Sequence, residues 1–319
     1  MLKKVWEEIL KYENIVLISH VNPDGDTIGS SLALFDVLKQ LEKNIYLFNT
    51  SKALPKKYSF LPNYEKFSNV LPPKIDAVIV CDCATFERTG IKRGDYKVIN
   101  IDHHSTNPSF GDENLVFKNF SSTAMVVYKM LKHNDINFSK DAATALYVGI
   151  VDDTNFFTSG NLDSNTFLNV SDIFSHGADI NLVSNRLTQN VPLARFRLQE
   201  HAMNSVDLLK NAKVAKIIIW QNDLKRTGAK REDAENLANI MCTLVSVELS
   251  FLILEEEDGA FKVSLRSKSD SIDVSKIAFK FGGGGHYGAA GFESSLLDPE
   301  EITLKILHEY DKEKNVVGL

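Results

Sequence analysis

The sequence predicts an α/β protein: a mostly parallel, doubly wound sheet joined by a linker helix to a smaller second α/β domain. Continuous apolar runs at residues 15–19, 77–83 and 97–104 are typical of strands that are covered on both faces. Helical patterns alternate with strands early in the chain, as in parallel sheets with crossover helices. With 319 residues, the chain is long enough for two domains.

The first apolar run ends at His20 and is followed by Asn22-Pro23-Asp24-Gly25-Asp26, a turn that presents two aspartates. A helix near residues 27–43 is expected next, capped by Asp26 or Thr27. Ligands bind at the carboxyl ends of strands in open α/β sheets, so an imidazole and two carboxylates there indicate a divalent-metal site. The alternative is a turn whose aspartates bond the local backbone beside a histidine that is already hydrogen-bonded.

The remaining elements follow in order. A short strand at 45–48 and a proline-rich surface segment precede the second and third apolar runs. Helices are then expected at 122–134, 139–152 and 163–176. The pattern loosens at 181–193, and a charged helix at 194–209 is interpreted as a linker. The second unit is expected to contain strands at 214–220, 251–255 and 261–267 and helices at 231–245, 273–281 and 299–314. The predicted domains are residues 1–185 and 212–319, with a connection at 186–211.

Composition and charge indicate which partners and which cellular location to expect. Lys and Arg number 36 against 42 Asp and Glu, a net charge of −6, so broad coating of long nucleic acid is not expected. Cys81, Cys83 and Cys242 form no zinc-binding pattern, and free thiols fit a reducing compartment. The charged N-terminus lacks an apolar signal core, and no apolar stretch is long enough to span a bilayer. We therefore expect a cytoplasmic protein without membrane contacts.

Acidic and histidine residues gather in four segments, namely His20-Asp24-Asp26, Asp82, Asp102-His103-His104 and Asp152-Asp153. The first three segments follow predicted strands, so they would project from one edge of the sheet. So many carboxylates would raise one another's pKa values unless cations were bound. Two divalent cations would relieve the repulsion, and mixed imidazole and carboxylate ligands suit manganese. Taken singly, Asp82 could cap a helix, His103 could be a packed histidine, and the Asp152-Asp153 pair could be a solvated helix end.

These segments resemble the four motifs of the DHH phosphoesterases: His-x-Asn-Pro-Asp-Gly-Asp, a strand-end Asp, Asp-His-His and Gly-Ile-x-x-Asp-Thr. Gly282–Gly291, with the sequence GGGGHYGAAG, resembles the signature of the DHHA1 domain. The layout is most similar to the branch that degrades very short RNA and dephosphorylates 3′-phosphoadenosine 5′-phosphate. The larger RecJ-type exonucleases carry a further nucleic-acid-binding domain that this sequence does not show.

The resemblance implies two divalent ions, manganese or alternatively magnesium or cobalt. It assigns one ion to His20, Asp24 and Asp82, and the other to Asp26, Asp82, His103 and Asp153, with Asp82 as the catalytic bridge. His104 is implied as a catalytic residue that faces the substrate phosphate, with Asp102 orienting a histidine. Asn155 replaces the usual glycine of the fourth motif. Asp153, which precedes Thr154 as the motif requires, is preferred over Asp152 as the ligand.

The resemblance also implies a substrate-binding group in the second domain, consisting of Arg266, Ser267, Gly283, Gly284, Gly285 and His286. Glycine N–H groups can cradle an anion, and a following helix N-terminus would add a favourable dipole. The alternative is a linker or a packing loop. The expected reaction is attack on phosphorus by a hydroxide that two metals activate.

The expected partners are short RNA, dinucleotides such as pApA and nucleotide bisphosphates, without long duplexes. A homodimer is compatible with the sequence. The alternative functions are a RecJ-like single-strand exonuclease, an inorganic pyrophosphatase and a non-catalytic nucleotide-binding module.

Overall fold

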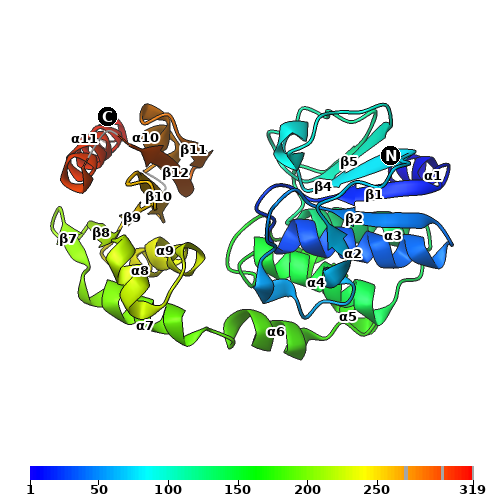
Figure 1. Ribbon diagram of the computed structural model, residues 1–319, viewed down its shortest axis with the longest axis horizontal. Helices are drawn as coiled ribbons and strands as arrows, with labels where there is room; N and C mark the ends of the chain where they lie inside the picture. Colours follow the sequence, from blue (N-terminus) through cyan, green and yellow to red (C-terminus); the bar gives the residue numbers. More distant parts are fainter. Residues whose placement is uncertain (269–271, 296–297, 318–319) are drawn as a thin grey trace. The chain divides into compact units, whose positions relative to one another are not determined.

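The computed structural model describes residues 1–268, 272–295 and 298–317, without the side chains of residues 286 and 315–317 (Figure 1). The chain forms two compact units, Met1–Asn190 and Val191–Leu319. Each unit is built on its own six-stranded sheet. None of the helices in the described ranges is long and apolar enough to cross a membrane.

The sheet of unit 1 is parallel throughout, with the strand order β3-β2-β1-β4-β5-β6. Its strands are β1 (Asn14–Ile18), β2 (Asn44–Phe48), β3 (Phe67–Ser68), β4 (Ala77–Cys81), β5 (Lys97–Asp102) and β6 (Glu113–Val116). The order reverses between β1 and β4, and the crevice at such a switch point is the ligand-binding position of doubly wound sheets. The predicted parallel α/β architecture is confirmed.

Helices cover one face of this sheet, as Figure 1 shows for α2, α3 and α4. The helices of unit 1 are α1 (Leu2–Ile9), α2 (Gly25–Gln40), α3 (Thr123–His133), α4 (Lys140–Asp153), α5 (Ser164–Ser175) and α6 (Ile180–Thr188). The other face buries Val16 and Ile18 under connecting segments, including the short 3-10 helix η3 (Phe86–Thr89). Long helices are therefore not needed to cover that face.

Unit 2 contains a mixed sheet with the order β11-β12-β10-β9-β8-β7, in which β8 and β9 are parallel. Its strands are β7 (Asp207–Leu209), β8 (Val214–Ile219), β9 (Leu249–Glu255), β10 (Phe261–Ser267), β11 (Gly284–His286) and β12 (Ala289–Ser294). Its helices are α7 (Leu193–Asn204), α8 (Gln221–Thr227), η4 (Arg231–Ala234), α9 (Leu237–Cys242), α10 (Val274–Lys280) and α11 (Pro299–Val317). Each face of this sheet has its own apolar cluster. One cluster packs α10 and α11 against the sheet, and the other packs α7, α8 and α9 against it.

Several predicted elements were wrong. The loosened pattern at 181–193 contains α6, whose start is capped by Asp179 and whose Val183 is buried. The helix expected at 231–245 is divided into η4 and α9, and Arg231 at the start of η4 is bound to Glu256 just after β9 (Nε–Oε1 2.7 Å). The expected linker helix at 194–209 ends at Asn204 and is followed by β7.

Candidate metal centre

The four acidic and histidine segments meet beside the carboxyl ends of β1, β4 and β5. His20 and Asp24 follow β1, Asp82 follows β4, and His103 follows β5. The fourth segment lies at the end of α4. This helix packs closely along α2, which brings the segment to the other three. A Cβ on Gly29 would lie 2.3 Å from the backbone oxygen of Ala145, so this helix contact requires glycine.

The side-chain donor atoms form two adjoining groups. In one group, His20 Nε2 lies 3.5 Å from Asp24 Oδ2 and 3.7 Å from Asp82 Oδ2. In the other, His103 Nε2 lies 3.4 Å from Asp153 Oδ2, 3.6 Å from Asp82 Oδ1 and 3.9 Å from Asp26 Oδ2. Atoms that share a small divalent ion at about 2.1 Å lie roughly 3–4 Å apart. Asp82 turns Oδ2 toward His20 of the first group and Oδ1 toward His103 of the second. Asp82, His103 and His104 form a further, overlapping group of metal-compatible spacing.

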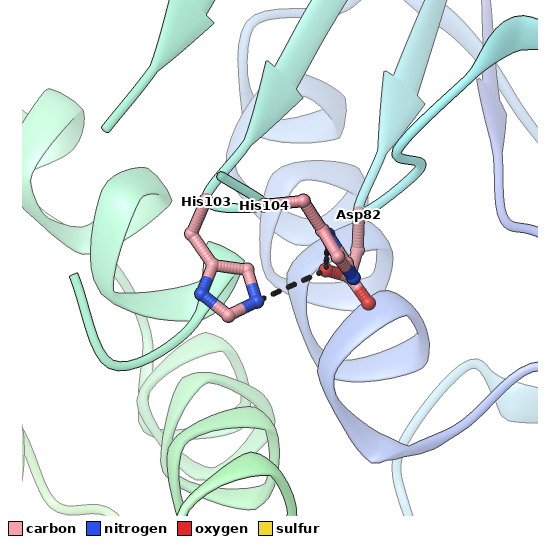
Figure 2. Close-up of side chains that lie close together, drawn as sticks. All are labelled: Asp82, His103 and His104. Atoms are coloured by element: carbon pink, nitrogen blue, oxygen red, sulfur yellow. Dashed lines mark ion pairs between the residues drawn. The ribbon is translucent and has the colours of Figure 1, made fainter. Parts of the chain in front are cut away.

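Figure 2 shows Asp82 beside His103 and His104 at the ends of neighbouring strands. Three hydrogen bonds set the tautomers of the histidines. The Nδ1 atoms of His20 and His103 lie 2.9 Å and 3.1 Å from the carbonyl oxygens of Val21 and Phe120. Because a carbonyl oxygen only accepts, each Nδ1 carries the hydrogen, and each Nε2 offers its lone pair to the cluster. His104 Nδ1 instead donates to Asp102 Oδ1 at 2.8 Å.

The buried carboxylates are held by the start of α3. Asp26, which is 1 % exposed, accepts hydrogen bonds from the backbone N–H groups of Thr123 (2.6 Å) and Ala124 (2.8 Å). The Thr123 hydroxyl donates to Asp82 Oδ1 at 2.9 Å. Asp82 adopts a left-handed backbone conformation (φ +60°), which aspartate tolerates better than most residues. Our sequence analysis did not single out Thr123.

Gly149 is a second contributor that sequence reasoning left without a role. A Cβ at this position of α4 would lie 2.6 Å from the Cβ of Ala124 and 2.9 Å from Asp26 Oδ1. Its place in the Gly-Ile-x-x-Asp-Thr motif was a signal that could have identified it.

The three residues directly after this motif all have a positive φ, and the first of them is Asn155 (φ +45°). Asparagine tolerates that region better than most residues, which explains how it replaces glycine here.

Charge repulsion makes the cluster a good fit for cations. Burial and the charges of Asp82 and Asp153 raise the pKa of Asp26 well above its usual value. Burial, together with the charges of Asp82 and Asp24, raises the pKa of Asp153 to about 7, although His103 opposes this shift. Burial and the charge of Asp24 also raise the pKa of Asp82. Bound divalent cations would stabilise the ionised carboxylates, and the donor set of imidazole and carboxylate groups suits them.

Asp152 makes different contacts from those of its neighbour Asp153. Its Oδ2 accepts hydrogen bonds from the backbone N–H of Gly25 at 2.9 Å and from the Tyr58 hydroxyl at 2.8 Å. It thereby ties the end of α4 to the turn that carries Asp24.

The expected cap of α2 was wrong. Asp24, in an extended conformation, is the residue that accepts hydrogen bonds from the backbone N–H groups at the start of this helix.

His104 is held by a short chain of hydrogen bonds. Asp102, which is fully buried, accepts from His104 Nδ1 through one oxygen and from Asn107 Nδ2 at 2.5 Å through the other. Burial alone would lower the pKa of His104, but the hydrogen bond to Asp102 and the charge of Asp82 raise it to about 9. The contact with Asp102 therefore favours the protonated form of the His104 imidazole.

The candidate substrate-binding residues of unit 2 cluster around β10 to β12. Arg266 on β10 donates from Nε to Asn239 Oδ1 at 2.6 Å, and the N–H of Ser267 donates to the backbone oxygen of Gly288 at 3.0 Å. The backbone of His286 pairs with Ala289, whereas the side chain of His286 lies outside the described part of the chain.

The glycine-rich stretch forms β11 and β12 rather than a loop before a helix, so the expected dipole of a following helix is not available to it. A Cβ on Gly283 or Gly285 would meet the backbone of β12 at 2.2 Å or 2.5 Å, which explains both glycines by strand packing. A Cβ on Gly284 would contact nothing within 4 Å, so this position remains open to a ligand.

Two family profiles match the chain. The DHH family, N-terminal domain, matches residues 14–150, and the DHHA1 domain matches residues 210–312. The chain therefore contains a DHH N-terminal domain followed by a DHHA1 domain. Both matches agree with the motifs: the DHH match contains His20, Asp82 and His103, and the DHHA1 match contains the glycine-rich stretch.

Relatives that carry a functional name match most of this chain. A protein of Thermus thermophilus named bifunctional oligoribonuclease and PAP phosphatase NrnA is 29 % identical over 307 residues, which cover 95 % of this chain and 91 % of the relative. The protein of the same name from Bacillus subtilis is 28 % identical, with 95 % and 96 % covered. An exopolyphosphatase-related protein from Bacteroides fragilis shares the fold, with a TM-score of 0.90, 23 % identity, and 100 % and 97 % covered.

Proposed function

We propose that this protein is a metal-dependent phosphoesterase. It hydrolyses short oligonucleotides, such as the dinucleotide pApA, to mononucleotides, and it converts 3′-phosphoadenosine 5′-phosphate to AMP. The observation that carries the proposal is the position of Asp82, whose two oxygens face two separate groups of imidazole and carboxylate donors. The names of the relatives, which match about 95 % of the chain, support the choice of substrates.

In this proposal, His20, Asp24 and Asp82 hold one manganese ion, and Asp26, Asp82, His103 and Asp153 hold the other. The bound pair would lower the pKa of a water molecule and neutralise charge on the phosphoryl oxygens. Asp82 joins the two groups, and the α3 N–H groups and Thr123 keep the carboxylates in place before any ion arrives.

The residues of the chain have distinct tasks around the reacting phosphate. Asp102 accepts the hydrogen bond from His104 Nδ1 and favours the imidazolium form, whose Nε2–H can donate to a phosphate oxygen. Asp152 orients the Asp24 turn through Gly25. Within the DHHA1 domain, Arg266, Ser267, Gly283, Gly284, Gly285 and His286 are the proposed nucleotide-binding group, and Gly284 is its glycine with open space beside it. A guanidinium bond to a phosphate contributes about 1.5–3 kcal/mol.

The experiment that tests the proposal compares substrates. Purified protein is incubated with Mn²⁺ and pApA, 3′-phosphoadenosine 5′-phosphate, pyrophosphate or a twenty-nucleotide RNA, and products are separated by chromatography. We expect AMP from the first two substrates and little reaction with the others, and chelation by EDTA should stop the reaction. Phosphate release from pyrophosphate alone would identify a pyrophosphatase, and rapid degradation of the long RNA would identify a RecJ-like exonuclease. Nucleotide binding without turnover of any substrate would identify a non-catalytic module.

A further inference from the structure

Arg88 lies at the edge of the metal centre on η3, the short helix that follows β4. Its backbone is firmly held: the Arg88 carbonyl accepts from the N–H of Val21 at 2.8 Å, and the neighbouring Thr89 carbonyl accepts from the Thr50 hydroxyl at 3.2 Å. Phe86 and Thr89 on the same helix are buried, whereas the Arg88 side chain is exposed. The guanidinium is therefore presented from a rigid base beside the turn that carries His20.

The guanidinium has free donors at this place. Its Nη2 lies 3.4 Å from His20 Nδ1, but that nitrogen already carries the hydrogen donated to Val21 O, so it cannot accept another. Within the described ranges, no carboxylate oxygen lies within the 4.0 Å ion-pair distance of Arg88, although His20 itself contacts Asp24 and Asp82. By contrast, Arg93 is bound to Asp112 at 2.7 Å.

Lys57, another cation of unit 1, already has partners. Lys57 lies 3.5 Å from Asp152 Oδ1, and its ammonium sits 4.6 Å from the ring centroid of Tyr58. Arg88 differs because its guanidinium contacts the ring of His20 instead of an acceptor. A guanidinium presents parallel N–H donors that match two oxygens of a phosphate, and it stays charged at every accessible pH.

We propose that Arg88 binds the non-bridging oxygens of the phosphate that is cleaved at the metal centre. This makes Arg88 a catalytic residue supplied by the DHH domain, distinct from the nucleotide-binding group of the DHHA1 domain. The inference rests on the proposed function, because it places an ester phosphate next to His20 and Asp82. If Arg88 instead bound a phosphate further along the oligonucleotide, its substitution would lower kcat/KM on pApA but not on a small ester that contains only the cleaved phosphate.

The test uses the full-length Mn²⁺-loaded protein with Arg88→Gln and Arg88→Lys. Lys92→Gln is the matched control, since it removes an exposed positive charge four residues further along the chain. The readouts are orthophosphate binding by calorimetry, kcat/KM on pApA and on bis(p-nitrophenyl) phosphate, Mn²⁺ affinity and the melting temperature. The small ester contains only the phosphate that is cleaved, so it isolates this contact from nucleotide binding.

We expect Arg88→Gln to lower kcat/KM by roughly one to two orders of magnitude on both esters. Orthophosphate affinity should fall about tenfold, within the range of one charge-assisted hydrogen bond. Arg88→Lys should recover part of each loss, because charge remains but the fork geometry is lost. Mn²⁺ affinity and melting temperature should stay at the wild-type values, as should every readout of Lys92→Gln.

Three results would overturn the inference: a loss confined to pApA, a loss that excess Mn²⁺ restores, or no loss on either ester. The first would place a more distant phosphate at Arg88, and the second would make the residue a support for His20. If the wild-type protein cleaved the small ester but not pApA, the proposed substrate would be wrong. The contribution of Arg88 would still be measured on the small ester and by orthophosphate binding.

Discussion

Asp152 and Asp153 are adjacent, yet their contacts predict opposite effects of substitution. Asp152→Ala leaves the hydroxyl of the fully buried Tyr58 without its acceptor and removes the bond to the Gly25 N–H. An unpaired buried hydroxyl and a lost bond to a charged group together cost about 2–4 kcal/mol. For a unit of this size, that loss lowers the melting temperature by roughly 5–15 °C. Asp153→Ala instead removes a carboxylate that its neighbours repel, so the metal-free protein should be equally or more stable.

Asp153→Ala, the less destabilising of the two variants, should have the larger effect on metal binding. We expect Asp152→Ala to bind two Mn²⁺ ions per chain with reduced affinity, and Asp153→Ala to bind one. Calorimetric Mn²⁺ titrations, combined with thermal unfolding before and after Mn²⁺ addition, measure both quantities on the same samples. The exposed Asp141→Ala at the first turn of α4 is the control and should change neither. If Asp153→Ala retained both ions while Asp152→Ala lost one, the assignment of these two carboxylates would be refuted.

Further predictions concern the metal bridge, substrate length, nucleotide binding and pH. Asp82→Ala should abolish hydrolysis and lower Mn²⁺ stoichiometry, and normal turnover with two bound ions would contradict the bridging role. Rates per RNA end should fall steeply from two to twenty nucleotides, because a chain of net charge −6 offers little attraction to a long backbone; equal rates would favour a processive exonuclease. Arg266→Ala and His286→Ala should lower kcat/KM on pApA by roughly one to two orders of magnitude but spare bis(p-nitrophenyl) phosphate and Mn²⁺ binding; parallel losses on both would place them in the reaction itself. Since the pKa of Asp153 is about 7 without metal, Mn²⁺ must displace a proton at lower pH. Calorimetry in buffers of different ionisation enthalpy should therefore show weaker binding and more proton release at pH 6 than at pH 8, and equal release would contradict the raised pKa.

The sheet of unit 1 and the gathering of its polar residues were predictable because strong local signals coincide. Apolar runs identify β1, β4 and β5, and chemistry-bearing residues such as Asp82 and His103 follow these runs directly. Parallel strands bring their carboxyl ends to one edge, so adjacency in space follows from position in the sequence. The same reasoning does not reach Tyr58, which meets Asp152 across 94 residues and has no local pattern that indicates the contact.

Other details depend on competition between nearby alternatives. Asp24, Asp26 and Thr27 are all acceptable caps for α2, and only the extended backbone of Asp24 decides between them. Asp26 is then free to bond the start of α3, a contact between distant segments. The glycine-rich stretch forms strands because β12 supplies a pairing partner for β11, which local propensity does not encode.

Central to the proposed function is that this protein holds two metal ions, one on either side of Asp82. Anomalous diffraction from crystals grown with Mn²⁺ measures this directly, because it locates each manganese without reference to activity. We predict two peaks per chain, one among His20, Asp24 and Asp82, and the other among Asp26, Asp82, His103 and Asp153. A single peak, or manganese bound away from Asp82, would contradict the account.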